Sequence, residues 1–194
     1  DEAHAAGICG ERGTGQIESL GLDHDRCLSI NTGGKALGVG GAFVAGPSWA
    51  IEYLIQCARP FVYSTAPPPA MADALQASLA IVDAEPDRRH RLKARARQLR
   101  TRLRDAGFDV AAGDSHIVPI IVGDNDRAVA VARAIQAEGF DVRVIRPPSV
   151  PEGTARLRVS VNAGLEEAAL ERFRNDLAEA NRVGIPIVAM ADTN

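Results

Sequence analysis

Three consecutive prolines separate two parts of this chain of 194 residues that differ in composition. They occupy positions 67–69, directly after Ser64, Thr65 and Ala66. Proline fixes φ at about −65° and lacks the backbone N–H that helices and sheets use, so neither element continues through this segment. We therefore predict a domain boundary here, with one domain over residues 1–66, a second over residues 67–182 and a tail over residues 183–194.

Helical and extended patterns alternate after the prolines. The helical stretches are 70–84, 86–106, 126–138 and 166–182, and the extended stretches are 116–122, 140–145 and 155–161. In the third of these helices Val129, Ala132 and Ile135 recur every three residues, which predicts its buried face. This order of elements is typical of an α/β layer, a small sheet with helices on one side.

Glycine dominates the part before the prolines. Of the 18 glycines in the chain, 11 lie within the first 60 residues. Apolar runs next to glycine clusters predict two short strands, at 27–30 and 41–45, and a helix at 48–58. We expect strands joined by tight loops in this part.

Composition and charge argue against several classes of protein. The net charge of −3 gives no overall attraction to nucleic acid or to anionic membranes, and no apolar run approaches the roughly 20 residues that a membrane span needs. Cys9, Cys27 and Cys57 are isolated and odd in number, which fits neither a disulfide framework nor a metal site. We expect no metal, and a reducing, cytoplasmic setting.

The stretch at 87–104 carries eight arginines and one lysine. Such a helix could bind nucleic acid or a membrane, or it could be a solvated face with Leu92, Leu99 and Leu103 underneath and arginine stems along the core. The acidic balance of the rest of the chain favours the solvated face.

The first four residues, Asp1-Glu2-Ala3-His4, admit two interpretations. DEAH occurs in helicases, where the acids hold Mg²⁺ and an upstream loop of the form GxxxxGK[ST] holds phosphate. Here the Gly-Lys pair ends at Lys35, downstream of DEAH, and Ala36 follows it instead of Ser or Thr. The phosphate loop is therefore missing, and the sequence does not support a helicase.

Lys35 supports a second interpretation. It stands in the glycine-rich stretch 32–38 (TGGKALG), and lysine is rarely buried without a chemical reason. Burial favours the neutral amine, the form that a Schiff-base lysine requires. A lysine of this kind carries pyridoxal 5′-phosphate (PLP) when a carboxylate, here Asp1, keeps the ring nitrogen of the cofactor protonated. A surface lysine in a loop remains the alternative.

Five ordered segments of the chain resemble the α-oxoamine synthases, PLP enzymes that condense an amino acid with an acyl-CoA and in most members release CO₂. These segments are DEAHAAG, GERGTG, NTGGKALGVGGAFVAG, ARPFVYSTAPPPA and VIRPPSVPEGTARLRVSV. The resemblance runs from residue 1 to about residue 182. It implies an α/β fold, that of the fold-type I PLP-dependent transferases, with part of the large PLP-binding domain followed by the C-terminal small α/β domain.

The resemblance assigns roles around the cofactor. Asp1 resembles the aspartate that pairs with the pyridinium nitrogen, and His4 resembles the histidine beside the phenolic oxygen. Lys35 resembles the lysine that carries PLP and shuttles the α-proton, and Thr32 resembles a phosphate ligand.

Further roles concern the partner subunit and the substrate. Ser64 and Thr65 resemble the pair from which a hydroxyl reaches the phosphate in the neighbouring subunit, which implies a homodimer with its active sites at the interface. Arg158 resembles the arginine that holds the substrate carboxylate, a role that suits its planar fork. Arg156 is then expected to form a structural ion pair.

Two segments narrow the resemblance to one branch of the family. Residues 145–148 (IRPP) and 115–124 (SHIVPIIVGD) resemble the biotin-pathway branch, which condenses L-alanine with pimeloyl-CoA or a pimeloyl-carrier protein. The alternatives are a branch of the glycine C-acetyltransferase or 5-aminolevulinate synthase type, or a PLP-free fragment that acts as a dimerisation module. In this family further PLP and acyl-CoA contacts lie in an N-terminal half, so we expect the chain alone to be inactive and to hold PLP poorly.

Overall fold

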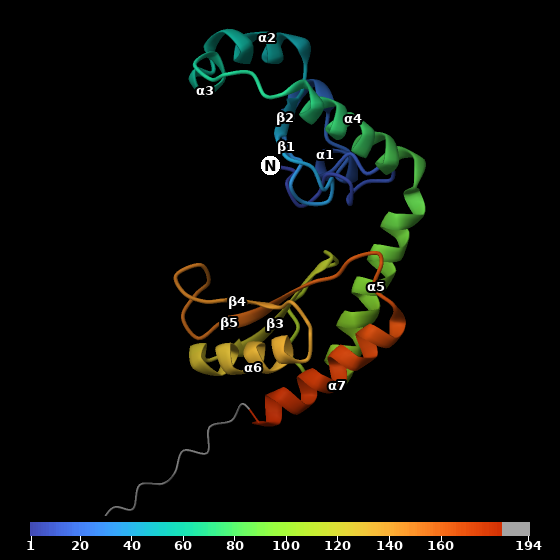
Figure 1. Ribbon diagram of the computed structural model, residues 1–194, viewed down its shortest axis with the longest axis vertical. Helices are drawn as coiled ribbons and strands as arrows, with labels where there is room; N and C mark the ends of the chain where they lie inside the picture. Colours follow the sequence, from blue (N-terminus) through green and yellow to red (C-terminus); the bar gives the residue numbers. More distant parts are fainter. Residues whose placement is uncertain (184–194) are drawn as a thin grey trace, which may run out of the picture. The chain divides into compact units, whose positions relative to one another are not determined.

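The computed structural model describes residues 1–183 and divides the chain into two compact units, Asp1–His90 and a second that begins at Arg91 (Figure 1). The division falls inside helix α5 (Pro86–Asp105). The predicted tail, residues 183–194, lies outside the described residues apart from Val183, the last residue of the last helix.

The sheet of the first unit has two antiparallel strands, β1 (Ser29–Thr32) and β2 (Ala42–Ala45). Both strands were expected from the sequence, although β1 begins two residues later than predicted because its pairing with β2 starts only at Ser29, opposite Ala45. The nine residues between the strands include the glycine-flanked Lys35.

The helical segments of the first unit are α1 (Gln16–Ser19), a 3₁₀ turn (His24–Arg26), α2 (Ser48–Cys57), α3 (Arg59–Val62) and α4 (Pro69–Ala84). The helices predicted at 48–58 and 70–84 are confirmed. The last of the three prolines stands at the start of α4. A backbone N–H at this position would have no acceptor within the helix, so proline loses no hydrogen bond there.

In the second unit three antiparallel strands form a sheet in the order β3-β5-β4 (Figure 1). The strands are β3 (Ile117–Gly123), β4 (Arg143–Ile145) and β5 (Ala155–Ser160), in agreement with the predicted stretches. Strand β4 is shorter than predicted at its start, because the Val142 N–H donates to the nearby Phe140 carbonyl at 3.0 Å instead of to a neighbouring strand. The ring of Phe140 packs edge-on against Phe173, 5.2 Å between centroids.

Helices α5, α6 (Asn125–Ala137) and α7 (Glu167–Val183) complete the second unit, and α6 packs against all three strands and against α7. The buried face of α6 consists of Ala128, Val131, Ala132 and Ile135. Sequence periodicity predicted Ala132 and Ile135 correctly, but Val129 is only half-buried because the true stripe follows spacings of three and four residues.

The arginine-rich helix α5 has the expected apolar underside, since Leu92, Leu99 and Leu103 are buried. Its arginines contribute more than a solvated face. The guanidinium of Arg100 is buried and donates to the carbonyl oxygens of Ala111, Ser115 and Ile117, which secures the chain leading into β3.

Helix α4 belongs to the first compact unit, whereas the sequence placed a domain boundary before it. The Ser78 hydroxyl on α4 donates to the Leu37 carbonyl, 2.7 Å away, in the connection between β1 and β2. The boundary at residues 66 and 67 stays a prediction about domains, and the compact units divide later, at residues 90 and 91. None of the helices within residues 1–183 is both long and apolar enough to span a membrane.

Candidate active site

The first four residues form a turn beside β1. The Glu2 N–H donates to the Ile30 carbonyl of β1, 2.8 Å away, so the start of the chain runs along this strand. Asp1 and His4 are exposed, whereas Glu2 and Ala3 between them are buried. Asp1 Oδ1 accepts a hydrogen bond from the Ala3 N–H at 2.8 Å, which ties the carboxylate of Asp1 to the turn.

Lys35 lies in the connection between β1 and β2. The Gly33 N–H donates to the Gly41 carbonyl, and the Gly38 N–H donates to the Lys35 carbonyl. A Cβ on Gly33 would stand 2.5 Å from the Val39 carbonyl oxygen and 2.9 Å from Leu75, so glycine is required there. This connection is therefore a tightly closed loop with Lys35 at its tip.

The sequence left open whether Lys35 is a buried Schiff-base lysine or a surface lysine in a loop. In the described chain its side chain is exposed. Gly34 has no side chain to cover the amine, and Ala36 is itself exposed. The apolar anchor of the loop is instead Leu37, which is buried.

The Lys35 loop packs against the turn that carries Asp1 and His4. A Cβ built on Gly7, at the end of that turn, would lie 3.3 Å from the Cβ of Ala36 and 3.7 Å from Leu37. Together with the bond from Glu2 to β1, this contact brings the two sequence motifs into one region of the first unit.

Thr32, the last residue of β1, has a polar atom without a protein partner. Its Oγ1 is buried and makes no hydrogen bond among residues 1–183. A buried hydroxyl that the protein leaves unsatisfied is unusual and is expected to serve a ligand or a water molecule.

Ser64 and Thr65 lie in another segment, between α3 and α4, and both are exposed. The Ser64 hydroxyl donates to the Phe61 carbonyl at 3.0 Å and so closes the end of α3. Among residues 1–183 no hydrogen bond joins this pair to Thr32 Oγ1, and the role expected for the pair in a neighbouring subunit stays a prediction.

Arg158 lies in the second unit, on the central strand β5. Its cross-strand neighbours are Pro119 on β3 and Arg143 on β4. Arg158 is half-buried, and its guanidinium has no hydrogen-bond or ion-pair partner among residues 1–183. Arg156 differs, because it donates to the carbonyl and hydroxyl oxygens of Thr154 at 3.0 and 2.9 Å, so its structural contact is a pair of hydrogen bonds instead of the expected ion pair.

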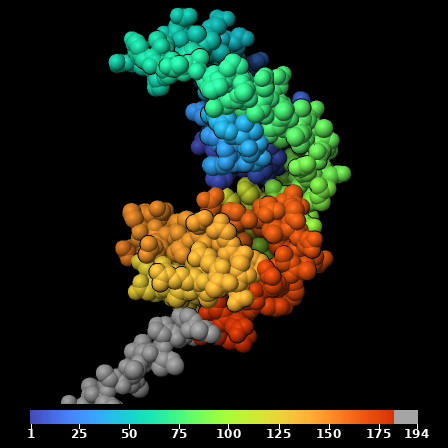
Figure 2. Space-filling model, in the orientation of Figure 1, coloured from blue at the N-terminus to red at the C-terminus, as the bar shows by residue number. Residues whose placement is uncertain are grey.

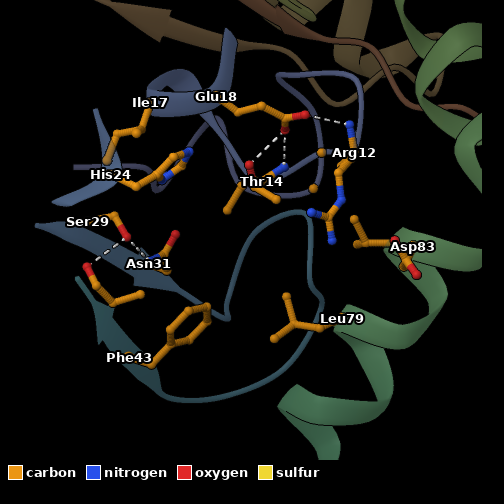
Figure 3. Close-up of a pocket in the computed structure, with 15 residues that line it drawn as sticks. Arg12, Thr14, Ile17, Glu18, His24, Ser29, Asn31, Phe43, Leu79 and Asp83 are labelled. Carbon is orange, nitrogen blue, oxygen red and sulfur yellow. Dashed lines mark hydrogen bonds between the residues drawn. The ribbon is translucent and has the colours of Figure 1, made fainter. Parts of the chain in front are cut away.

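The first unit also contains a cavity of about 460 Å³ that is lined in part by β1 and β2 (Figure 3). None of the seven predicted site residues lines it. Its walls come from the loop at 12–14, α1, the two strands and α4, and include Arg12, Glu18, His24, Asn31, Phe43 and Leu79. Gly7, which lies against Ala36 of the Lys35 loop, also lines this cavity.

Glu18 organises one wall of this cavity (Figure 3). Desolvation raises the pKa of its carboxyl, but the N–H of Arg12 and the hydroxyl and N–H of Thr14, with a smaller contribution from Glu11, together lower that pKa from 4.5 to about 2. The carboxylate accepts these bonds at 2.8 Å from Arg12 N, 2.7 Å from Thr14 Oγ1 and 3.0 Å from Thr14 N.

Sequence reasoning missed the structural roles of Glu2 and Glu18. Their carboxylates occupy the space where Cβ atoms would be on Gly15 and Gly10, respectively. The signal was present in the glycine spacing of GERGTG, since Gly10, Gly13 and Gly15 all have positive φ. No sequence pattern, however, indicates which side chains fill the space that these glycines leave.

Comparison with protein families gives a match over most of the chain. The family model described as aminotransferase class I and II matches residues 1–177. Among curated proteins, 8-amino-7-oxononanoate synthase of Anaeromyxobacter dehalogenans is 49% identical over 92% of this chain and 45% of its own length. The synthase of the same name from Cupriavidus taiwanensis is 47% identical over 93% of this chain and 46% of its own length. The chain thus spans about half the length of the curated relatives it matches.

Solved structures give the same result for the fold. A structure of SPT with PLP superposes with a TM-score of 0.88 at 29% identity and covers 95% of this chain and 47% of its own. The 8-amino-7-oxononanoate synthase of Francisella tularensis superposes with a TM-score of 0.84 at 25% identity, over 94% of this chain and 54% of its own.

Proposed function

Because the chain belongs to the aminotransferase class I and II family, we propose that it forms the lysine-bearing half of an 8-amino-7-oxononanoate synthase, a PLP-dependent acyltransferase of biotin biosynthesis. The expected fold class, an α/β fold of the fold-type I PLP enzymes, is confirmed. The observation that carries the proposal is the closed Lys35 loop packed against the turn of Asp1 and His4.

The residues of the first unit fit PLP. The buried Thr32 Oγ1 has no partner among the described residues and offers a donor to a phosphate oxygen. Lys35 is accessible at the tip of its loop, and Asp1 uses only Oδ1 in the described hydrogen bonds. We propose that Lys35 Nζ carries PLP, that Thr32 holds the phosphate, and that Asp1 and His4 hold the ring.

Each of these residues then has a defined chemical task. When bound, PLP supplies an electron sink for the α-carbon of an amino acid. The Asp1 carboxylate favours a proton on the ring nitrogen, because an adjacent negative charge stabilises the cation. Lys35 Nζ removes the α-proton of the substrate and returns a proton to the same carbon at the end of the reaction.

Arg158 is the proposed carboxylate site. Its guanidinium is unengaged among the described residues, whereas that of Arg156 is committed to Thr154. A planar guanidinium binds a carboxylate through two parallel hydrogen bonds, which fixes the orientation of an amino acid as well as its position. The proposed substrate is L-alanine.

The proposed reaction joins the α-carbon of L-alanine to the carbonyl carbon of pimeloyl-CoA or of a pimeloyl-carrier protein. The thiol of the acyl donor leaves as this bond forms, and the carboxylate of alanine leaves as CO₂. Support for this choice of substrates is the name that the relatives at 47% and 49% identity share.

We also propose that the working protein is a homodimer, with Ser64 or Thr65 reaching the phosphate of the partner's cofactor. The segment before these residues supports an interface, because α2 and α3, turquoise in Figure 2, expose the large side chains of Trp49, Tyr53 and Phe61. Exposed aromatic side chains gathered on neighbouring helices are typical of protein–protein contacts. The three cysteines are free thiols, which supports the proposed cytoplasmic setting.

The chain by itself is expected to hold PLP weakly and to lack synthase activity, because it spans about half the length of the relatives whose activity is proposed. Ring stacking contributes roughly 0.5–1.5 kcal/mol, and each phosphate hydrogen bond that is missing costs about 1–3 kcal/mol. The loss of stacking and of one phosphate hydrogen bond together amounts to roughly tenfold to a thousandfold or more in affinity.

A labelling experiment tests the proposed function in a way that tolerates weak binding. The chain is incubated with excess PLP, reduced with borohydride and mapped by mass spectrometry. We expect the label on Lys35 in preference to Lys93, the other lysine of the chain, and to the terminal amine of Asp1. Pyridoxal without its phosphate is the control and should lose this preference, as should Thr32→Val. Equal labelling of both lysines would contradict the proposal and favour the PLP-free module.

A further inference from the structure

The turn of residues 1–4 is held from the inside by Glu2. Asp1 and His4 face outward, whereas Glu2 is 3% exposed. Both oxygens of its carboxylate are engaged: Oε2 accepts from the Gln16 N–H at 2.7 Å and Oε1 accepts from the Ile17 N–H at 3.0 Å. The side chain therefore reaches 14 and 15 residues along the chain to the first turn of α1.

The backbone of Glu2 makes the other attachments of this turn. Its N–H bonds to Ile30 in β1, and its carbonyl accepts from the N–H groups of Ala5 and Ala6, both at 2.8 Å. One residue thus joins the strand that ends at Thr32, the turn that carries Asp1 and His4, and the loop that leads into α1.

Gly15 is shaped to receive the Glu2 carboxylate. A Cβ on Gly15 would lie 2.5 Å from Glu2 Oε2, and the residue has φ of +129°. Only glycine allows the carboxylate to come close enough to bond the two N–H groups that follow. The buried carboxylate of Glu2 and the missing side chain of Gly15 therefore fit each other.

We propose that Glu2 is a positioning residue, whose buried carboxylate sets the direction in which Asp1 and His4 point. This inference rests on the proposed function only for what Asp1 and His4 do. Glu2 touches neither PLP nor substrate in this proposal and acts through Asp1 and His4. A charge-assisted pair of hydrogen bonds suits the task, because it is stronger and more directional than a neutral contact.

Amide hydrogen exchange in the full chain, measured by NMR without PLP, tests the positioning role directly. The N–H groups of Ala3, Ala5 and Ala6 report on the turn, and those of Gln16 and Ile17 report on the bonds to the carboxylate. In Glu2→Gln, one of the two acceptors becomes a donor, so both sets should exchange roughly tenfold to a hundredfold faster, as expected for a lost charge-assisted bond. The Leu157 N–H of the second unit should be unchanged, which separates a local change from lower stability of the whole chain.

Three further variants distinguish loss of the Glu2 contacts from a general loss of stability in the first unit. Gly15→Ala should reproduce the pattern of Glu2→Gln, because its Cβ pushes the carboxylate away. Gly21→Ala also strains a positive φ, of +61°, but nothing lies within 4 Å of its Cβ, so it should leave Ala3, Ala5 and Ala6 unchanged. Glu11→Gln removes an exposed carboxylate of the same unit and should likewise have no effect there. If Gln16 and Ile17 exchange faster while the turn does not, Glu2 only supports α1 and the proposal is overturned.

A second measurement follows PLP itself, by its visible absorbance with the full chain. Glu2→Gln should raise the half-saturating PLP concentration roughly tenfold, the loss expected for one misplaced charge-assisted contact. In a background that carries both Asp1→Asn and His4→Ala, the same change should have no further effect, because Glu2 acts through these two residues. A tenfold effect of Glu2→Gln that persists in this background would overturn the proposal. If borohydride labelling of the unaltered chain does not favour Lys35, the proposed function fails, and hydrogen exchange alone decides the role of Glu2.

Discussion

The two compact units of this chain differ in how much apolar surface they bury. The largest fully buried side chains, among them Leu99, Ile120 and Leu157, belong to the second unit. The exposed large apolar side chains, from Leu20 to Ile81, belong to the first. Among the described residues, the second unit therefore has its own hydrophobic core, whereas the first leaves much of its apolar surface uncovered.

What holds the first unit instead is a set of polar contacts around glycines. Glu2, Glu18 and the buried Arg89 all bond to the backbone of the loop at 10–17, and Gly10, Gly13 and Gly15 leave room for them. Such contacts fix geometry more than they contribute stability, because each net hydrogen bond is worth only about 1 kcal/mol. The proposed cofactor residues Asp1, His4 and Lys35 therefore lie in the unit whose backbone is fixed by polar contacts, and not in the unit with the larger hydrophobic core.

The largest expected effect lies in the core of the second unit. Leu157 on β5 is 0% exposed, so Leu157→Ala should lower the free energy of unfolding by about 2–5 kcal/mol through lost burial and a residual cavity. In the first unit Ile30→Ala, at a side chain that is 52% exposed, should cost less than about 1 kcal/mol. Urea denaturation followed by residue-level hydrogen exchange measures both, since the two units need not unfold together. Equal costs would contradict the comparison.

The second effect concerns the two buried arginines, one in each unit. Arg89 donates to the Val82 and Glu11 carbonyls, and Arg100 donates to three carbonyls that precede or begin β3. Replacing either with Met leaves buried acceptors unpaired, at a cost of about 1–3 kcal/mol for each acceptor that water does not reach. Exchange should accelerate in the loop at 10–15 for Arg89→Met and at β3 for Arg100→Met.

Arg88→Met is the matched control for these two variants. Arg88 neighbours Arg89 but is exposed, and among residues 1–183 it pairs only with Glu85, so its loss should leave the free energy of unfolding nearly unchanged. An effect of Arg88→Met as large as that of Arg89→Met would mean that the carbonyl contacts of Arg89 are not what matters.

The sequence predicted the second unit better than the first, and the reason is physical. Strands and helices of the second unit bury one face against a core, so their apolar residues recur with the period of the element. The error at Val129 is an error of one helical position within a stripe that was otherwise correct. The spacing of apolar residues within one helix or strand therefore predicts its buried face, whatever that face packs against.

The first unit depends on contacts that periodicity does not encode. The motifs indicated Asp1, His4 and Lys35, because their residue types and glycine context are unusual. They did not decide between a buried and an exposed Lys35, which is exposed in the described chain because its glycine neighbours close a loop without covering it. The contact of Glu2 with Gln16 and Ile17 spans a turn and a loop, so no local spacing indicates it. An acidic residue beside a motif is also equally compatible with a surface position.

A third prediction separates the proposed tasks of the two units. Arg158→Ala should raise the L-alanine concentration that half-saturates the spectral change of the PLP-loaded chain by roughly tenfold to a hundredfold, since a bidentate charge-assisted contact is lost. Labelling of Lys35 by PLP should stay the same. Arg156→Ala should leave alanine binding largely intact and act on stability, because Arg156 is bonded to Thr154. The reverse order of the two variants would show that the wrong arginine was chosen.

The smallest expected effect is a pH dependence confined to the first unit. The pKa of Glu18 is lowered from 4.5 to about 2 by the bonds from Arg12 and Thr14, which outweigh desolvation. A carboxyl whose pKa is lower in the folded state contributes stability that is fully present above pH 4.5 and is lost as the pH falls towards 2. Because this side chain is only half-buried, solvent screening reduces the contribution to about 1 kcal/mol.

Hydrogen exchange or amide shifts of Arg12 and Thr14, followed from pH 5 down to about pH 2, measure this contribution in the loop that Glu18 closes. Both N–H groups should lose protection across that window, since protonation removes the charge that they bond. Glu18→Gln is the control, because an amide of the same shape has no carboxyl to titrate and should abolish the pH dependence. A loop that opens at the same pH in Glu18→Gln would assign the transition to another group, and the polar contacts at Gly10 would then not be what specifies this part of the first unit.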